Sequence, residues 1–263
     1  KPRTLFYSRP PPPSEEAEVE RMAALATPEG RAAVQAVSPR AVSPGLVYSA
    51  EWLRPPGGEL GFLGRVAGFV EVRVDRTPRG PALIGETVRV RIEPGVRLGP
   101  GDLLQTFHIT RRGRELGSVQ RPTGMLVVTG VEEGGVIAAV SSVFGRIGEG
   151  EWVRLAPEGI PGPDALAVPV QSNVSARIVG FAEDRQIQGF NARVFLDVGT
   201  GEGIIAGDVF RAHVDEPGAR FGTEAARLEV VLVEDGLSTA RIVGMTHPDL
   251  EVGDRLRLIA KMR

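Results

Sequence analysis

Hydrophobic and polar positions alternate in short runs along the chain from Leu46 onward. Apolar residues take every second position in Arg65–Val74 and Thr87–Ile92, with Arg and Glu between them. Glycine-containing turns separate such runs, and no segment with helical periodicity is long enough to cross between parallel strands. A period of two with frequent turns is typical of antiparallel sandwiches and barrels. The pattern therefore predicts an all-β fold.

The β region contains an internal repeat. Leu126–Leu155 aligns with Leu228–Leu258, and each run holds an acidic-Gly turn near its start and a Gly-acid pair before its end. The match continues upstream through further glycine turns and alternating segments. Two copies of about 100 residues have the usual size of a domain, and closing a sheet into a barrel removes its exposed edges. We therefore predict two tandem, repeated small β-barrel-like modules, at residues 46–157 and 162–263.

The first 45 residues have a different composition. Lys1–Pro13 ends in four consecutive prolines, which donate no backbone hydrogen bond and favour the extended polyproline II conformation. Ser14, followed by acidic residues and a modest apolar stripe, predicts the start of a short helix, and Thr27-Pro28 predicts a second. We therefore predict an extended Pro-rich arm with one or two short helices at residues 1–45.

The apolar residues of this arm cannot form a core by themselves. We expect them to dock onto a protein partner or a neighbouring subunit, because a polyproline segment is preorganised and loses little entropy on binding. The residues predicted to make this contact are Leu5, Phe6, Tyr7, Pro10, Pro11, Pro12 and Pro13.

A Gly-Asp pair preceded and followed by apolar residues occurs three times, and a variant with Glu in place of Asp lies within Ile147–Val153. Glycine allows the positive φ of a tight turn, and the carboxylate can accept backbone N–H bonds across it. Recurrence at equivalent places in both modules indicates a fold determinant rather than a catalytic acid-base pair. The predicted structural turns are Gly101, Asp102, Gly207, Asp208, Gly253 and Asp254.

Composition narrows the classes of function. The 263 residues carry 31 Lys and Arg against 33 Asp and Glu, and this net charge of −2 argues against a nucleic-acid partner. The absence of cysteine excludes disulfides, thiolate metal sites and a cysteine nucleophile. Apolar runs stay below the roughly 18 residues of a membrane-spanning helix, so we expect no membrane span. We also expect no cofactor.

Few residues suggest ligand binding or catalysis. The histidines His108, His213 and His247 lack metal-ligand spacing and are interpreted as structural or surface residues. Tyr48 and Trp52 would share one face of a strand, which makes them the candidate ligand contact. This pair leaves open an alternative function, a carbohydrate-binding module for peptidoglycan or exopolysaccharide.

Adjacent carboxylates lie on two predicted hairpin tips, Glu132-Glu133 and Glu234-Asp235. A glycoside hydrolase needs two acids held across a cleft. A glycan-active enzyme is therefore the second alternative, although solvation is the ordinary state of acids on hairpin tips.

Four short motifs resemble those of a known group of proteins: Leu98–Leu103, Leu116–Val119, Val136–Val140 and Ile147–Val153. They resemble the C-terminal β modules of bacterial cell-envelope proteins that begin with a LysM peptidoglycan-binding domain. The second module also looks like small β-domains of flagellar-ring and outer-membrane accessory proteins. The resemblance implies a location in the periplasm or on the cell surface, a scaffolding role, and peptidoglycan binding through a domain upstream of Lys1.

The leading hypothesis from the sequence is therefore a non-enzymatic cell-envelope scaffold or assembly subunit. We expect it to dock to a partner complex through its N-terminal arm.

Overall fold

The computed structural model describes residues 42–58, 61–70, 80–111, 117–162, 164–185, 187–214, 223–247 and 250–263. The predicted arm, with Leu5–Tyr7 and Pro10–Pro13, lies outside these residues. Among the described residues, helix is confined to α3 (Pro44–Tyr48) and one 3-10 turn, η1 (Thr200–Glu202), and no helix there is long and apolar enough to cross a membrane. The strands are β1 (Trp52–Arg54), β2 (Gly64–Phe69), β3 (Thr87–Ile92), β4 (Leu103–Arg111), β5 (Ser118–Glu132), β6 (Gly135–Val143), β7 (Trp152–Leu155), β8 (Ala167–Pro169), β9 (Ser175–Phe181), β10 (Arg193–Leu196), β11 (Val209–Val214), β12 (Thr223–Val233), β13 (Ser238–Met245) and β14 (Arg255–Met262).

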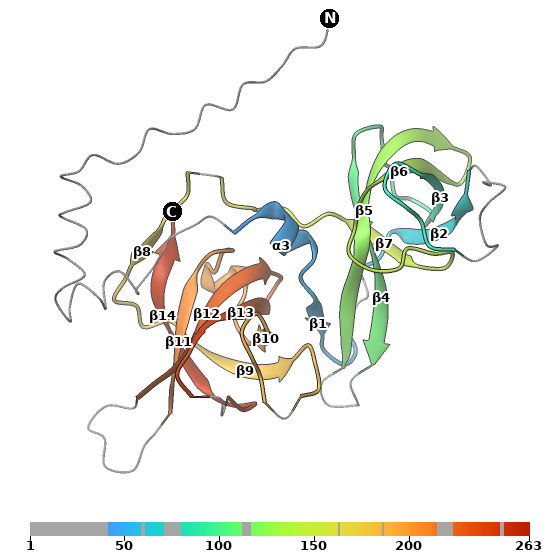
Figure 1. Cartoon of the computed structure of the whole chain (residues 1–263). Coiled ribbons are helices and arrows are strands. Elements are labelled where there is room, and N and C mark those ends of the chain that lie inside the picture. The colour runs from blue at the N-terminus through green and yellow to red at the C-terminus, as the bar shows by residue number, and fades with distance from the viewer. Residues whose placement is uncertain are drawn as a thin grey trace, which may run out of the picture. The chain divides into compact units, whose positions relative to one another are not determined.

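The strands of the first module form a closed antiparallel barrel, which we call barrel 1 (Figure 1). Its ring order is β2-β3-β6-β5-β4-β7, and β7 closes the ring by pairing with β2. The short strand β1 lies outside the ring and adds to β5. All backbone edges of the six ring strands are therefore paired with a neighbour.

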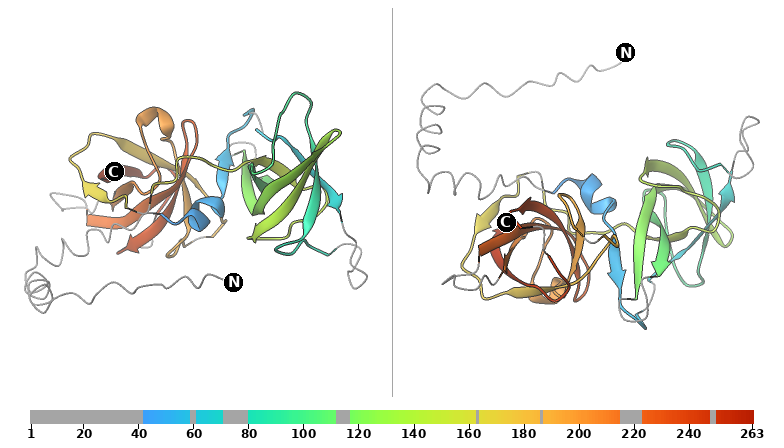
Figure 2. Two further views of the ribbon diagram at one scale, coloured as in Figure 1. Left: turned by 90° about the horizontal axis from the view of Figure 1, so that it is seen from above. Right: turned by 60° about the horizontal axis from the view of Figure 1, so that its bottom comes forward.

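The second module forms barrel 2 with the same connectivity (Figure 2). Its ring order is β9-β10-β13-β12-β11-β14, and β14 closes the ring on β9. Each strand occupies the place of its repeat equivalent in barrel 1, and β8 adds to β14 outside the ring. The predicted all-β fold with two repeated barrel-like modules is confirmed.

Alternation along the strands creates the two cores. In β3, which coincides with the predicted Thr87–Ile92, Val88 and Val90 point into barrel 1 and are at most 1% exposed, while Arg89 and Arg91 are exposed. The same period of two holds in β14 of barrel 2. Burying such a valine or leucine stabilises the fold by about 1.5–3 kcal/mol, so each barrel has a core of its own.

Candidate functional site

The segment that leads into barrel 1 is buried between the two barrels. Helix α3 begins at Pro44, a residue suited to the first helical position because no N–H is required there. The chain then extends into β1, whose Trp52 is 1% exposed. The buried cluster comprises Val42, Val47, Ala50 and Trp52 of the segment, Phe107 of barrel 1, and Val231 and Leu232 of barrel 2.

A second apolar cluster continues the contact on the other side of β1. Leu53 of β1 and Val119 of β5 pack with Ala182 and Phe195 of barrel 2, and all four are at most 6% exposed. We call the two clusters together the junction. Phe107 and Phe195 lie on the outer faces of their barrels, so the junction buries surface that a separate barrel would expose.

The residues predicted as a ligand contact belong to this junction. Tyr48 ends helix α3 and Trp52 begins β1, so the prediction that both lie on one strand is wrong. The Trp52 ring meets the edge of Phe107 at a centroid distance of 5.0 Å, and the Arg154 guanidinium lies 3.5 Å from its centroid. With its faces covered in this way, the indole offers no stacking platform to a sugar.

Arg154 connects the barrels through a chain of polar contacts. This β7 residue donates from Nε to Oε1 of Gln105 (2.7 Å) and from Nη1 to Oε1 of Glu234 (2.7 Å), at the β12–β13 turn of barrel 2. Gln105 in turn donates to the carbonyl of Tyr48 (2.6 Å). Burial lowers the pKa of the Arg154 guanidinium, and the Glu234 carboxylate opposes that shift.

Other hydrogen bonds and an ion pair cross the junction beside the contacts of Arg154. Thr239 of β13 donates its hydroxyl to the carbonyl of Glu51 (2.7 Å), and Arg121 of β5 donates to the carbonyl of Ala182 (2.9 Å). Arg193 lies 3.7 Å from the Glu51 carboxylate, and burial lowers the pKa of this guanidinium. The apolar clusters and these directional bonds together fix the two barrels to the intervening segment.

The Gly-Asp turns are built alike at three places. The glycines at 101, 207 and 253 have φ of 95°, 92° and 101°, values that favour glycine. In each turn an Oδ2 atom accepts the N–H of the residue three positions earlier, at 2.7 Å for Asp102, 3.0 Å for Asp208 and 2.8 Å for Asp254. Each carboxylate therefore closes the turn that leads into the following strand.

Asp208 makes contacts beyond its own turn. Its side chain is fully buried, its Oδ1 accepts the N–H of Met262 (2.8 Å), and its Oδ2 lies 2.5 Å from the Lys261 ammonium. Both partners belong to the last part of β14, whose extension pairs with β8. Asp208 thus couples a turn of barrel 2 to the strand that closes its ring.

We expect Asp208→Asn to destabilise the protein by about 2–3 kcal/mol, because it removes the charge facing Lys261 and one backbone acceptor. The matched change Asp254→Asn alters an exposed turn with a single backbone bond and should cost less than about 1 kcal/mol. Urea denaturation measures both free energies of unfolding. Equal losses would show that the buried network adds nothing to the turn.

The candidate histidines and acidic residues do not come together in one site among the described residues. His108 of β4 and His213 of β11 lie on equivalent strands and are exposed. Partial desolvation of the His108 ring, with the Arg121 charge nearby, lowers the pKa of His108. Glu132 pairs with Arg89 on the surface at 3.3 Å, whereas its repeat equivalent Glu234 pairs with Arg154. The described residues contain no cluster of three or more metal-ligating side chains.

The Glu variant of the turn behaves differently from the Asp turns. The Glu151 carboxylate is bonded to the Thr123 hydroxyl (3.1 Å), which is itself bonded to Thr106 (2.9 Å). Burial raises the pKa of Glu151, although the Thr123 hydrogen bond opposes the shift. The Glu151 side chain, which is longer than that of Asp, thus belongs to a polar cluster of barrel 1 with Thr123 and Thr106.

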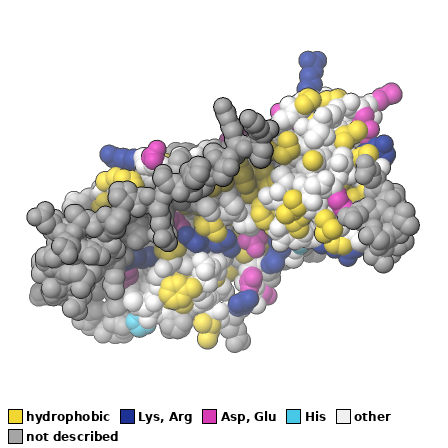
Figure 3. All heavy atoms as spheres, turned by 45° about the horizontal axis from the view of Figure 1, so that its top comes forward, with side chains coloured by type: hydrophobic (Ala, Val, Ile, Leu, Met, Phe, Trp, Pro, Cys, Tyr) yellow, Lys and Arg dark blue, Asp and Glu magenta, His cyan; other side chains and the backbone are white. Residues whose placement is uncertain are grey.

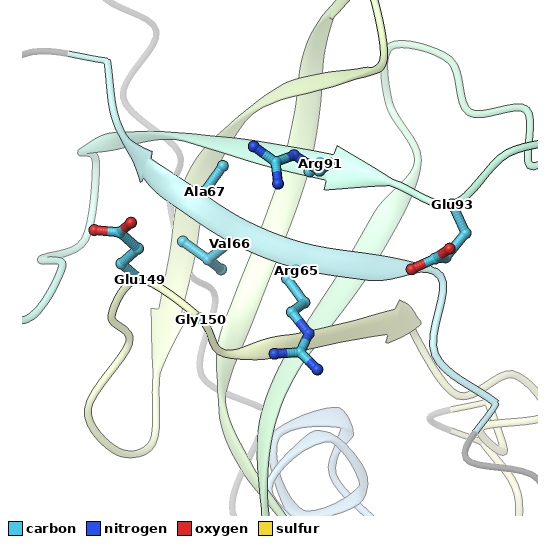
Figure 4. A pocket seen from close by; sticks show the side chains of 7 residues that line it. All are labelled: Arg65, Val66, Ala67, Arg91, Glu93, Glu149 and Gly150. Atoms are coloured by element: carbon cyan, nitrogen blue, oxygen red, sulfur yellow. The ribbon is translucent and has the colours of Figure 1, made fainter.

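A shallow pocket of about 430 Å³ lies on the outer face of barrel 1 (Figure 4). Arg65 and Arg91 stand opposite each other on β2 and β3, and Glu93 and Glu149 lie toward its two ends. Arg65 extends toward β7, where its guanidinium lies 3.4 Å from the Trp152 ring centroid. Its two cations and two anions give the pocket no net preference for one charge.

An exposed apolar turn recurs in both barrels. Ile84 precedes β3 and Phe190 precedes β10, and they are 69% and 66% exposed. The next residue, Gly85 or Asn191, has a positive φ and donates its N–H to β6 or β13 respectively. Each of the two turns thus presents a large apolar side chain to solvent.

Among the residues that the structure describes, basic and acidic side chains are not segregated on the face of the molecule that Figure 3 shows. On the face shown in Figure 3, basic and acidic side chains of the described residues are interspersed among apolar ones. This distribution lacks the single-sign stripe that a polyanion would select.

Comparison with protein-family models and with curated proteins gave no match. The resemblance to LysM-associated modules therefore stays a prediction from short motifs.

Proposed function

We propose that this chain is a non-catalytic scaffold of the bacterial cell envelope that holds two β-barrels in a fixed arrangement and docks to protein partners. The observation that carries the proposal is the junction, in which Trp52 and Arg154 lie buried between the barrels. A flexible tandem would leave such surfaces polar and solvated, because domains joined by small polar interfaces move relative to each other.

Two kinds of contact point would serve assembly. The Pro-rich arm around Phe6 would supply an apolar segment, and the turns at Ile84 and Phe190 would supply exposed apolar side chains on both barrels. Placement in the periplasm or on the surface, and anchoring to peptidoglycan through a domain upstream of Lys1, follow from the motif resemblance and belong to the same proposal.

Distance measurement between the barrels tests the scaffold directly. The chain has no cysteine, so spin labels at Arg91→Cys on β3 and Arg257→Cys on β14 would be the only ones present. Both positions are exposed, so labelling should leave the cores intact. We expect one narrow distance distribution by double electron–electron resonance. A broad distribution in the unaltered junction would contradict a rigid scaffold.

Photo-crosslinking tests the contact points. We place the photo-crosslinker benzoylphenylalanine at position 84, at position 190 or at position 7. All three probes should capture the same protein from native membranes, either a partner or a second copy of this chain. A matched probe at exposed Arg257 should capture neither. Capture from position 257 alone would overturn the assignment of these contact points.

A further inference from the structure

A cavity of about 310 Å³ opens at the junction, beside the contact of Arg154 with Glu234. Apolar side chains of both barrels form much of its wall, among them Leu63, Leu155 and Val233. Two guanidinium groups, Arg54 and Arg154, line the same cavity. The site thus combines an aliphatic wall with two cations.

Each of the two arginines has a buried hydrogen-bond donor that is not satisfied by any acceptor among the described residues. Arg154, whose side chain is 9% exposed, satisfies Nε and Nη1 through Gln105 and Glu234, but its buried Nη2 has no partner among the described residues. The buried Nε of Arg54 has none either. A guanidinium has donors only, so each group requires an acceptor that the described residues do not provide.

The cavity is lined by two arginines and two glutamates, of which Glu234 is paired with Arg154. The Arg54 charge disfavours the charged form of Arg154, and the Glu234 carboxylate, which pairs with Arg154, favours it. Glu158 lines the cavity as well, but it is exposed to solvent, where its charge is screened. One further negative charge would neutralise the inner part of the site.

We propose that this cavity binds an aliphatic carboxylate. The carboxylate accepts hydrogen bonds from Arg54 and Arg154, a pairing that guanidinium geometry favours. The hydrocarbon part lies against Leu63, Leu155 and Val233. The same chemistry is offered by a free short-chain acid and by an acidic side chain of a docking protein. This binding activity goes beyond the scaffold role and does not depend on it.

Isothermal titration with sodium butyrate tests the proposal, with sodium chloride at equal ionic strength and neutral butyramide as controls. We expect butyrate alone to bind and to raise the melting temperature, because a ligand that binds only the folded state stabilises it. No heat and no thermal shift with butyrate would overturn the proposal, as would equal responses to butyramide.

Variants locate the site. Arg54→Gln should weaken butyrate binding about tenfold or more, because hydrogen bonds to a charged group are lost. Glu158→Gln should change butyrate binding little, because this carboxylate is exposed and screened by solvent. Arg65→Gln on the outer face of barrel 1 should leave butyrate binding unchanged. Circular dichroism confirms that each variant is folded. Unchanged affinity in Arg54→Gln, or weaker binding in Glu158→Gln, would contradict the assignment.

A peptide distinguishes the two sources of the carboxylate. If acetyl-Gly-Glu-Gly-amide binds more tightly than butyrate and its Gln counterpart does not bind, an acidic side chain of a partner is the occupant. If butyrate binds more tightly, a free acid is the occupant. If neither butyrate nor the Glu peptide binds, the proposed carboxylate site is wrong. If the distance distribution between the spin labels is still narrow, the scaffold proposal stands.

Discussion

Replacing Trp52 with Ala is expected to destabilise the protein by about 3–5 kcal/mol and to free the two barrels from each other. The indole is 1% exposed and lies between Phe107 and the Arg154 guanidinium. Its removal leaves a cavity and takes away the surface on which the arginine is stacked. Because each barrel has its own apolar core, we expect the barrels to stay folded while the junction opens.

Two measurements together identify this outcome. Urea denaturation gives the loss of free energy, and the distance distribution between labels at positions 91 and 257 should change from narrow to broad. Leu126→Ala is the matched control, since it removes a fully buried side chain from the core of barrel 1 at a cost of about 2–5 kcal/mol. The control should lower stability while the distribution stays narrow. Equal broadening in both variants would show that the junction has no separate role.

Much of this architecture follows from the sequence, because the period of two and the repeat specify which side chains face each core. Val88 and Val90 alternate with arginines, and β3 begins and ends where that alternation predicts. The repeat then gives barrel 2 the same strand order as barrel 1. Turns and alternation encode the hairpin pairs β4–β5 and β5–β6 locally, whereas the pairs β2–β7 and β3–β6 that complete the ring join strands far apart in sequence.

The junction could not be predicted in this way, because local pattern does not reveal what covers the outer face of a strand. Arg154 and Arg257 occupy equivalent positions in the two barrels, yet Arg154 is buried and Arg257 is exposed. Gln105 and Phe107 also point outward from β4, but both are fully buried. Their burial depends on the segment that precedes barrel 1 and on barrel 2.

One signal for this segment is present in the sequence. Ser43-Pro44 has the same pattern of a cap residue followed by proline that predicts a helix at Thr27-Pro28. The helix ends at Tyr48 and β1 begins only at Trp52, so the two residues do not share a strand and the prediction failed.

Replacing Glu234 with Gln is expected to cost about 3 kcal/mol, because it leaves the Arg154 guanidinium buried without a compensating charge. Arg154→Met should cost about 1 kcal/mol or less, since it removes that charge, keeps an aliphatic chain on Trp52 and leaves a carboxylate that is 31% exposed. The double variant should therefore resemble Arg154→Met rather than the sum of the two changes.

The internal repeat supplies a control for the double-mutant cycle of Glu234 and Arg154. Glu132 occupies the equivalent hairpin position, and its ion pair with Arg89 is half exposed, so Glu132→Gln should cost less than about 1 kcal/mol. Salt should weaken that surface pair more than the junction pair, because buried charges are less screened. Urea denaturation of the unaltered protein, the two single junction variants and their double variant gives the coupling free energy, and Glu132→Gln is measured beside them at low and high salt. Additive losses for Glu234→Gln and Arg154→Met would mean that the pair contributes no energetic link between the barrels.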